Sequence, residues 1–249
     1  MDDSSVIGSS PATWDAMAQG YDAERTADPV YDACIRQAVA DLHPAGTVLD
    51  CGCGTGLATR HLLCADSVHG LDFSRQMLKQ IRRRFGARHV KTMQGDVREL
   101  PYPDAMFDCV LVANVLQHLA RDDQRRAATE IMRVLKPDGR FSVSVHHYSV
   151  EKQRAGWIKE GKPGGKDGCD YIFRYTRSEL AALFPSARIR AVGFYNWPAQ
   201  MLITRTAGHT LARRGHGHMI LAYGVARKFA QANLSVSIAN KSRRPFRGR

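Results

Sequence analysis

Short β-branched runs alternate with helical segments from Gly46 onward, and this alternation constrains the fold more than any other feature of the sequence. Strands separated by helices are joined by crossover connections, which place neighbouring strands parallel in one sheet. We therefore expect an α/β protein whose mostly parallel sheet carries helices on both faces. The runs that predict its first five strands are Thr47–Asp50, Val68–Leu71, Val90–Met93, Phe107–Ala113 and Phe141–Val145.

The helices between these strands carry recognisable start signals. A helix is expected through Leu57–Leu62, directly after a glycine-rich turn. Ser74 predicts an N-cap for the next helix, which carries Met77, Leu78 and Ile81 on its apolar side. Asp122 predicts a cap for a later helix.

The pattern is weaker beyond residue 148. Glu151–Asp170 is rich in Gly and Lys and predicts a loop, whereas Thr176 and Glu179 predict a capping box that opens a helix over Leu180–Phe184. Two further runs complete an expected seven-stranded sheet, Ile189–Phe194 and the alternating Leu234–Ala239. Between them, Pro198–Asn233 is typical of a mostly helical insertion, with Met219, Tyr223, Ala226 and Ala230 on one face.

The charge of the chain is concentrated at one end. Of 249 residues, 36 are basic and 24 acidic, and the resulting +12 lies entirely in residues 180–249, which contain 12 basic residues and no acid. This segment predicts a positive surface that follows RNA phosphates, lies on anionic lipid, or has no function of its own. The sequence contains no run of about 18 apolar residues, so it predicts no membrane span.

Cysteine usage and the first residues suggest a compartment. Six Cys residues at irregular spacing are typical of reduced thiols, and the start MDDSSVIGSS is acidic and polar where a signal peptide is basic and then apolar. We therefore expect a cytoplasmic protein. Cys51 and Cys53, with His61 and Cys64, have poor spacing for zinc, and we expect no metal.

The glycine-rich turn Asp50–Gly56 (DCGCGTG) follows the first predicted strand. Glycine lets a backbone approach a ligand closely and adopt dihedrals closed to other residues. A dinucleotide-binding turn of the form G-x-G-x-x-G needs Gly at position 57, but the chain has Leu57 there. The turn therefore favours a ligand without a pyrophosphate.

Acidic residues end the next two predicted strands. Asp72 stands 20 positions after Gly52, where a carboxylate can accept both hydroxyls of a ribose, and Asp96 suits the exocyclic amine of a purine. Each of these acids alone is equally well explained as a helix cap. Because open α/β sheets bind ligands outside the carboxyl ends of their strands, the three positions together predict a nucleoside site.

Four segments resemble successive motifs of the class I methyltransferases that use S-adenosylmethionine: VLDCGCGTG, GLDFSRQML, GDVRELPYPDAMFDCVLVANVLQHL and EIMRVLKPDGRF. The resemblance covers roughly Trp14–Tyr148 and returns in LSVSIANKSR, which resembles the last strand of that family. It implies a Rossmann-like fold and S-adenosylmethionine as cofactor. Cys51 and Cys53 depart from the apolar and small residues usual there.

The resemblance also implies roles for single residues. It places Asp50, Gly52, Gly54 and Gly56 at the methionine end of the cofactor and Asp72 at the ribose. The adenine would contact Phe73, Met77, Asp96 and Val97, and Asn114 would lie near the sulfonium and the amino acid. Tyr21 matches an N-terminal aromatic residue that often closes over the cofactor.

Three histidines are candidates for a general base, which methyl transfer needs only when the acceptor must lose a proton. His118 follows the fourth predicted strand, and His146 and His147 follow the fifth. A helix cap or a buried, hydrogen-bonded histidine explains each of these positions as well.

These features predict a single methyltransferase domain over residues 1–249. Its parts are an N-terminal helical lid (1–45), a cofactor-binding core (46–148), an acceptor-side half (149–198), a helical cap insertion (199–233), a last strand (234–240) and a basic tail (241–249). We expect O- or N-methylation of a small, apolar, anionic or lipid-like molecule. The alternatives are an RNA acceptor such as a modified tRNA nucleoside, an NAD-dependent oxidoreductase, and a binding protein that keeps only the fold.

Overall fold

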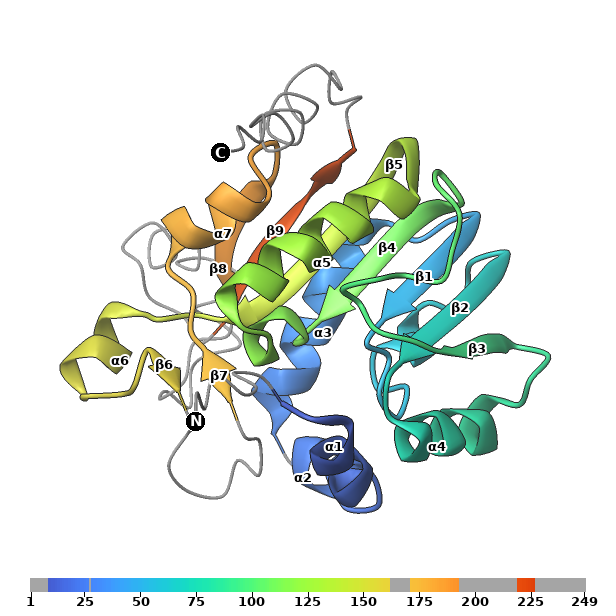
Figure 1. The fold of residues 1–249 in the computed structure, drawn as a ribbon, viewed down its shortest axis with the longest axis horizontal. Helices are drawn as coiled ribbons and strands as arrows, with labels where there is room; N and C mark the ends of the chain where they lie inside the picture. The colour runs from blue at the N-terminus through green and yellow to red at the C-terminus, as the bar shows by residue number, and fades with distance from the viewer. Residues whose placement is uncertain (1–8, 27, 162–170, 193–218, 227–249) are drawn as a thin grey trace, which may run out of the picture.

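A seven-stranded sheet forms the centre of the computed structural model, which describes residues 9–26, 28–161, 171–192 and 219–226 (Figure 1). The strand order is β3-β2-β1-β4-β5-β9-β8. The first five strands pair in parallel, whereas β9 is antiparallel to both β5 and β8. The bounds are β1 Thr47–Cys51, β2 Ser67–Asp72, β3 Val90–Gln94, β4 Phe107–Ala113, β5 Leu135–His146, β8 Arg188–Val192 and β9 Met219–Val225.

Helices cover both faces of this sheet. Their bounds are α1 Pro11–Met17, α2 Tyr21–Thr26, α3 Pro29–Leu42, α4 Arg75–Phe85, α5 Arg121–Val134, α6 Val150–Arg154 and α7 Arg177–Leu183. A separate pair of short strands, β6 Glu160–Gly161 and β7 Ile172–Phe173, lies beside α6 (Figure 1). No helix of the described residues is long and apolar enough to cross a bilayer.

The central strands are buried on both sides. In β4, Cys109 and Leu111 pack in one core with α3 and α4, and Val110 and Val112 pack in a second core with α5 and α7. Successive side chains of a strand point to opposite faces, so a strand covered on both faces needs apolar residues throughout. The predicted Rossmann-like architecture is thus confirmed.

Several sequence predictions of local structure are confirmed. All five predicted parallel strands form, and so does the sixth, as β8 up to Val192. Ser74 caps α4 by accepting a hydrogen bond from the Met77 backbone N–H. Thr176 and Glu179 form the predicted capping box at the start of α7.

The helix predicted over Leu57–Leu62 is wrong, because only a short 3-10 helix forms there, over Thr59–His61. The Thr59 hydroxyl donates a hydrogen bond of 2.6 Å to the Asp50 carboxylate and holds the turn against β1. Side chains that bond in this way compete with helical geometry.

The cap predicted at Asp122 is also wrong, because the N-cap position is Ala120 and Asp122 lies in the first turn. There it accepts a hydrogen bond from Arg125 instead of from the backbone. The loop predicted over Glu151–Asp170 contains the end of α6 and all of β6, while residues 162–170 lie outside the described residues.

The helix predicted over Pro198–Asn233 is wrong at Met219–Val225, which forms β9 and supplies the seventh strand. Met219 to Ala222 are all buried, and a strand buried on both faces shows no polar–apolar alternation. The helical cap insertion (199–233) therefore does not extend through residues 219–225. Residues 199–218, the strand predicted over 234–240 and the tail 241–249 lie outside the described residues.

Replacing Thr176 by Ala is expected to lower the free energy of unfolding by about 1 kcal/mol, because the Glu179 N–H loses its capping acceptor. Urea unfolding of the purified chain measures this change. Thr129→Ala is the control, since its hydroxyl bonds only the Arg125 carbonyl on the exposed side of α5. Equal midpoints for the two variants would refute a stabilising cap.

Candidate functional site

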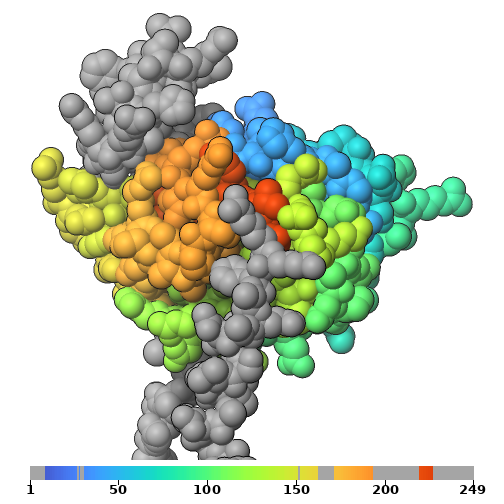
Figure 2. All heavy atoms as spheres, turned by 90° about the horizontal axis from the view of Figure 1, so that it is seen from above, coloured from blue at the N-terminus to red at the C-terminus, as the bar shows by residue number. Residues whose placement is uncertain are grey.

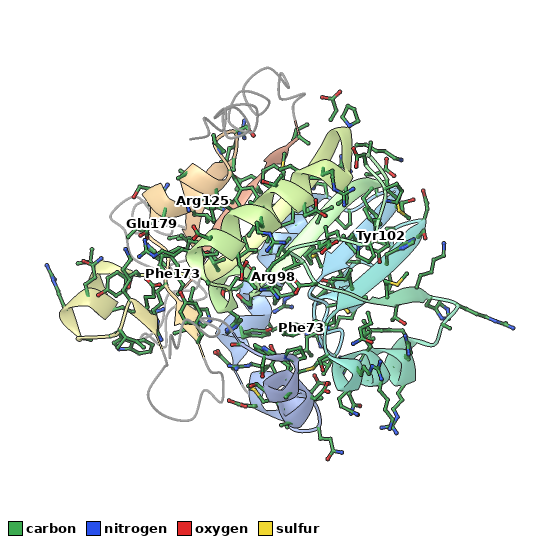
Figure 3. All side chains as sticks on the ribbon, in the orientation of Figure 1. Phe73, Arg98, Tyr102, Arg125, Phe173 and Glu179 are labelled. Carbon is green, nitrogen blue, oxygen red and sulfur yellow. The ribbon has the colours of Figure 1, made fainter. Side chains whose placement is uncertain are left out.

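A cavity of about 920 Å³ opens at the carboxyl ends of the parallel strands, and residues of α1 and α2 line its other side. Its volume is within the range of small-molecule sites. Figure 3 shows Phe73 and Arg98, two of its lining residues, between the sheet and these helices. Ten of the predicted site residues line it: Tyr21, Gly52, Gly54, Asp72, Phe73, Met77, Asp96, Val97, Asn114 and His118.

The glycine turn forms the floor of the cavity through two of its three glycines. Gly52 has φ +76°, and a Cβ there would lie 2.2 Å from Val115 Cγ2, so no other residue fits. Gly54 has φ +52° and nothing within 4 Å of its Cβ position. Gly56 does not line the cavity, since its Cα faces Phe85 and Ile81 of α4. Because Gly56 has no side chain, the turn can pack closely against α4.

Asp50 is fully buried and does not line the cavity. One carboxylate oxygen accepts from Thr59, and the other has no hydrogen-bond partner among the described residues. Burial raises the pKa of this carboxyl to about 7, although the Thr59 bond opposes the change. In this structure Asp50 holds the turn from behind.

Asp72 connects the turn to α4. One of its oxygens accepts from the Gly54 backbone N–H at 2.8 Å, and the other accepts from the Ser74 N–H at 2.9 Å. Burial raises the pKa of Asp72 to about 6, and the backbone hydrogen bonds hold it from rising further. The carboxylate lies in the cavity wall with its orientation fixed, as acceptance of two neighbouring hydroxyl groups requires.

Asp96, Arg98 and Asp123 form an ion-pair network in the wall beyond Asp72. The Arg98 guanidinium donates from Nε and Nη2 to the Asp96 carboxylate and from Nη1 to Asp123, at 2.6–3.0 Å. Burial alone would raise the pKa of Asp96, but the Arg98 hydrogen bonds lower it below its ordinary value. Asp96 therefore stays ionised and is held in one orientation.

The N-terminal helices close the cavity from above. The rings of Trp14 and Tyr21 line it, with their centroids 6.2 Å apart. Asp15 accepts from the Ser74 hydroxyl at 2.5 Å and from the Gln76 N–H at 3.1 Å, so it binds the start of α4. Asp22 accepts from the Thr55 hydroxyl at 2.5 Å, which ties α2 to the glycine turn.

The three candidate histidines lie in different surroundings. His118 lines the cavity, its Nδ1 lies 3.1 Å from the Tyr171 carbonyl oxygen, and its ring packs edge-on against Trp14 at 4.9 Å. His147 is buried and His146 is half-buried, and neither lines the cavity. Asn114, with φ +61°, lies in the wall between the turn and His118.

Sequence reasoning missed Arg98, Asp123 and Trp14. Arg98 stands two residues after Asp96, and this spacing between a strand-end acid and a basic residue was an available signal. Asp123 gave no such signal, because its partner lies 25 positions away in the sequence. No cluster of three His, Cys, Asp or Glu residues suited to a metal occurs in the described part of the chain.

Three carboxylates and one guanidinium line the cavity, namely Asp72, Asp96 and Asp123 against Arg98. The potential inside is therefore negative when all three acids are ionised, which favours a cationic ligand. The donors and acceptors follow the three strand ends in a row. This arrangement suits a nucleoside that carries a positive charge.

Comparison with known proteins gives the same picture. Residues 48–139 match the model of a family described as a methyltransferase domain. A demethylmenaquinone methyltransferase of Symbiobacterium thermophilum is 36% identical over 140 residues, which are 51% of this chain and 55% of that protein. The chain spans about half the length of most of the curated relatives it matches.

Two solved structures share the fold. A SAM-dependent methyltransferase of Thermotoga maritima superposes with a TM-score of 0.65 at 19% identity, covering 87% of this chain and 99% of that one. The 1,6-didemethyltoxoflavin N1-methyltransferase of Burkholderia thailandensis, solved with S-adenosylhomocysteine, gives 0.59 at 21% identity, covering 88% and 87%. The motifs, the sheet order and the family match over residues 48–139 agree: this part of the chain is similar to the class I S-adenosylmethionine-dependent methyltransferases.

Proposed function

We propose that this protein transfers a methyl group from S-adenosylmethionine to an oxygen or nitrogen atom of a small-molecule acceptor. The observation that carries the proposal is the cavity, whose polar wall comes from three neighbouring strand ends through Gly52, Gly54, Asp72 and Asp96. The names of the similar proteins, a demethylmenaquinone and a didemethyltoxoflavin methyltransferase, support a small acceptor.

The residues of the wall fit the parts of the cofactor in order. The open space over Gly54 admits the methionine end, and Asp72 accepts the ribose hydroxyls beside it. Phe73, Met77 and Val97 supply apolar surface for the adenine. Asp96 accepts the adenine amine while Arg98 holds the carboxylate in place.

When bound, the cofactor supplies a methyl carbon that its sulfonium has already activated. The chain then has to hold the acceptor in line with that carbon and exclude water. Trp14, Tyr21 and Asn114, which line the cavity, would hold the acceptor there. His118 is the group placed to take a proton from the acceptor, because its Nδ1 contact with Tyr171 orients the ring in the cavity wall. His146 and His147 are less suited, because neither lines the cavity.

Two alternative functions would each need a different binding site. An NAD-dependent oxidoreductase needs a pyrophosphate turn, but Leu57 is buried where that turn needs its third glycine. An RNA acceptor keeps the same cofactor site and needs a surface for phosphates. Two measurements distinguish these functions: which cofactor binds, and which molecule receives the methyl group.

Isothermal titration calorimetry tests the cofactor. S-adenosylhomocysteine is expected to bind and NADH to give no heat. Incubation with methyl-labelled S-adenosylmethionine then tests the acceptor, with a panel of phenols, amines and quinols beside a tRNA pool. Label in the small-molecule fraction supports the proposal. Heat with NADH alone, or label in the tRNA alone, would overturn it.

The affinity for S-adenosylhomocysteine is expected to rise with pH, because the Asp72 carboxyl can accept both ribose hydroxyls through its two oxygens only when it is ionised. With a pKa of about 6, this carboxyl is mostly protonated at pH 5 and ionised at pH 7.5. We expect about tenfold weaker binding at pH 5, measured by calorimetry across this range. Asp72→Asn should weaken binding by about 1–3 kcal/mol and flatten the profile. Asp66→Asn, an exposed control, should change neither.

Arg98→Gln is expected to weaken S-adenosylhomocysteine binding about tenfold, because the Asp96 carboxylate loses its charged partner. The preference over the hypoxanthine analogue, S-inosylhomocysteine, should fall as well. Arg126→Gln is the matched control: this residue also contacts Asp123, at 3.7 Å, but does not line the cavity. If the two variants keep the wild-type preference for adenine, Arg98 has no part in reading the base.

A further inference from the structure

The segment from Phe73 to Gly95 carries seven basic residues and no acidic one. It forms α4 and the edge strand β3, which lie at one side of the sheet (Figure 1). Arg75, Lys79, Arg82 and Arg83 of α4 are exposed and three, four or seven to eight positions apart, so they share one side of the helix. We call these four residues the α4 face. Side chains tipped with nitrogen extend from this helix in Figure 3.

The charge of the α4 face is offset only in part by the described residues, through Asp15, which lies at the start of the helix and interacts electrostatically with Arg75. None of its four side chains forms an ion pair within the described part of the chain, and neither do Arg88 and Lys91 beside it. Helix α5 is the contrast within the same molecule. Its basic residues Arg121, Arg125, Arg126 and Arg133 all pair with acids.

This arrangement costs the helix stability. Like charges three or four positions apart on a helix repel one another, as in the pairs Arg75–Lys79, Lys79–Arg82 and Lys79–Arg83. Helix α4 has no acidic residue of its own to relieve this repulsion. A bound polyanion would remove the same cost.

Two guanidinium groups of the face are already oriented. Arg75 Nε donates to Gln94 Oε1 at 3.1 Å, and Arg82 Nε donates to Thr92 Oγ1 at 2.6 Å. Both acceptors are neutral groups of β3. The bonds fix the side chains and leave their terminal nitrogens without a hydrogen bond in the described part of the chain. Fixed planar guanidinium groups are well suited to phosphate oxygens.

The surface is also hollowed. A depression of about 500 Å³ is lined by the four residues of the α4 face together with Gln76, Leu78 and Gln94. In Figure 2, which views the molecule from the side opposite α4, the cyan-to-green part of the chain forms the right-hand edge, and a long side chain extends from it. Gln94 lines this depression and the cofactor cavity, so the two share a wall.

We propose that the α4 face binds the phosphate backbone of an RNA strand without reading its sequence. A membrane surface fits less well, because membrane-bound helices insert apolar side chains, whereas Met77, Leu78 and Ile81 are at most 1% exposed. A protein partner needs an apolar centre for its interface, which α4 lacks for the same reason. Phosphates spaced along a strand need only the oriented cations.

This proposal goes beyond the proposed function, because it concerns a surface outside the cofactor cavity and holds whichever atom receives the methyl group. It also places an RNA contact elsewhere than in the basic residues after position 179. The two basic regions can be separated by substitution, since the α4 face lies in one helix of the described core.

Fluorescence anisotropy with a labelled 12-nucleotide oligouridylate tests the proposal at a series of salt concentrations. The test variant is Arg75→Gln/Lys79→Gln/Arg82→Gln/Arg83→Gln. The matched control Arg36→Gln/Arg125→Gln/Arg126→Gln/Lys136→Gln removes the same charge from ion pairs elsewhere. Both variants keep every basic residue beyond position 179.

At 100 mM salt the test variant is expected to bind at least tenfold more weakly than the wild type. The slope of log affinity against log salt should fall by about 3, since each phosphate contact to a single strand contributes about 0.7. The control should keep the wild-type slope. Equal losses in the two variants, or a wild type that binds anionic vesicles and not the RNA, would overturn the proposal.

Calorimetry with S-adenosylhomocysteine on all three proteins keeps the two proposals apart. Neither variant changes a residue that lines the cofactor cavity, so the affinity for this compound should stay that of the wild type. If the wild type fails to bind it, the proposed function fails while the RNA result stands. A test variant that loses this affinity together with its thermal stability is misfolded, and single Arg75→Gln and Arg83→Gln variants then decide the outcome.

Discussion

The position of the Asp72 carboxylate depends on two backbone N–H groups, and the cavity depends on that carboxylate. Gly54 and Ser74 each donate to one of its oxygens, so the glycine turn and the start of α4 are held to the end of β2 by one side chain. The cost is a buried acid whose pKa is raised to about 6. The site thus combines a rigid scaffold with a carboxyl group that titrates near neutrality.

The parallel half of the sheet was predictable because its signals are local. Each strand from β1 to β5 contains a short run with β-branched residues, and Ser74 sits immediately before its helix. Strand β9 was mistaken for helix because Met219–Ala222 are buried on both faces, which removes the alternation that marks a strand. The helix expected after the glycine turn failed because Thr59 bonds Asp50, a contact that no spacing rule contains.

The distinction between local sequence signals and contacts of distant residues also applies to the site. Glycines and strand-end acids follow from the order of motifs, so ten predicted residues do line the cavity. Arg98, in the segment after β3, and Asp123, in the first turn of α5, are 25 positions apart in the sequence and meet only in the folded chain. Packing roles were equally hidden, as Gly56 faces Phe85 instead of the cavity. Sequence patterns thus predicted the residues that line the cavity better than they predicted the residues that hold these in place.

The N-terminal carboxylates Asp15 and Asp22 tie α1 and α2 to the core through Ser74 and Thr55. Both acceptors of these bonds are half-buried acids on short helices, and both donors belong to the elements that shape the cavity. We therefore expect a chain that begins at α3 to keep its sheet but to lose the helices that close the cavity over its ligand.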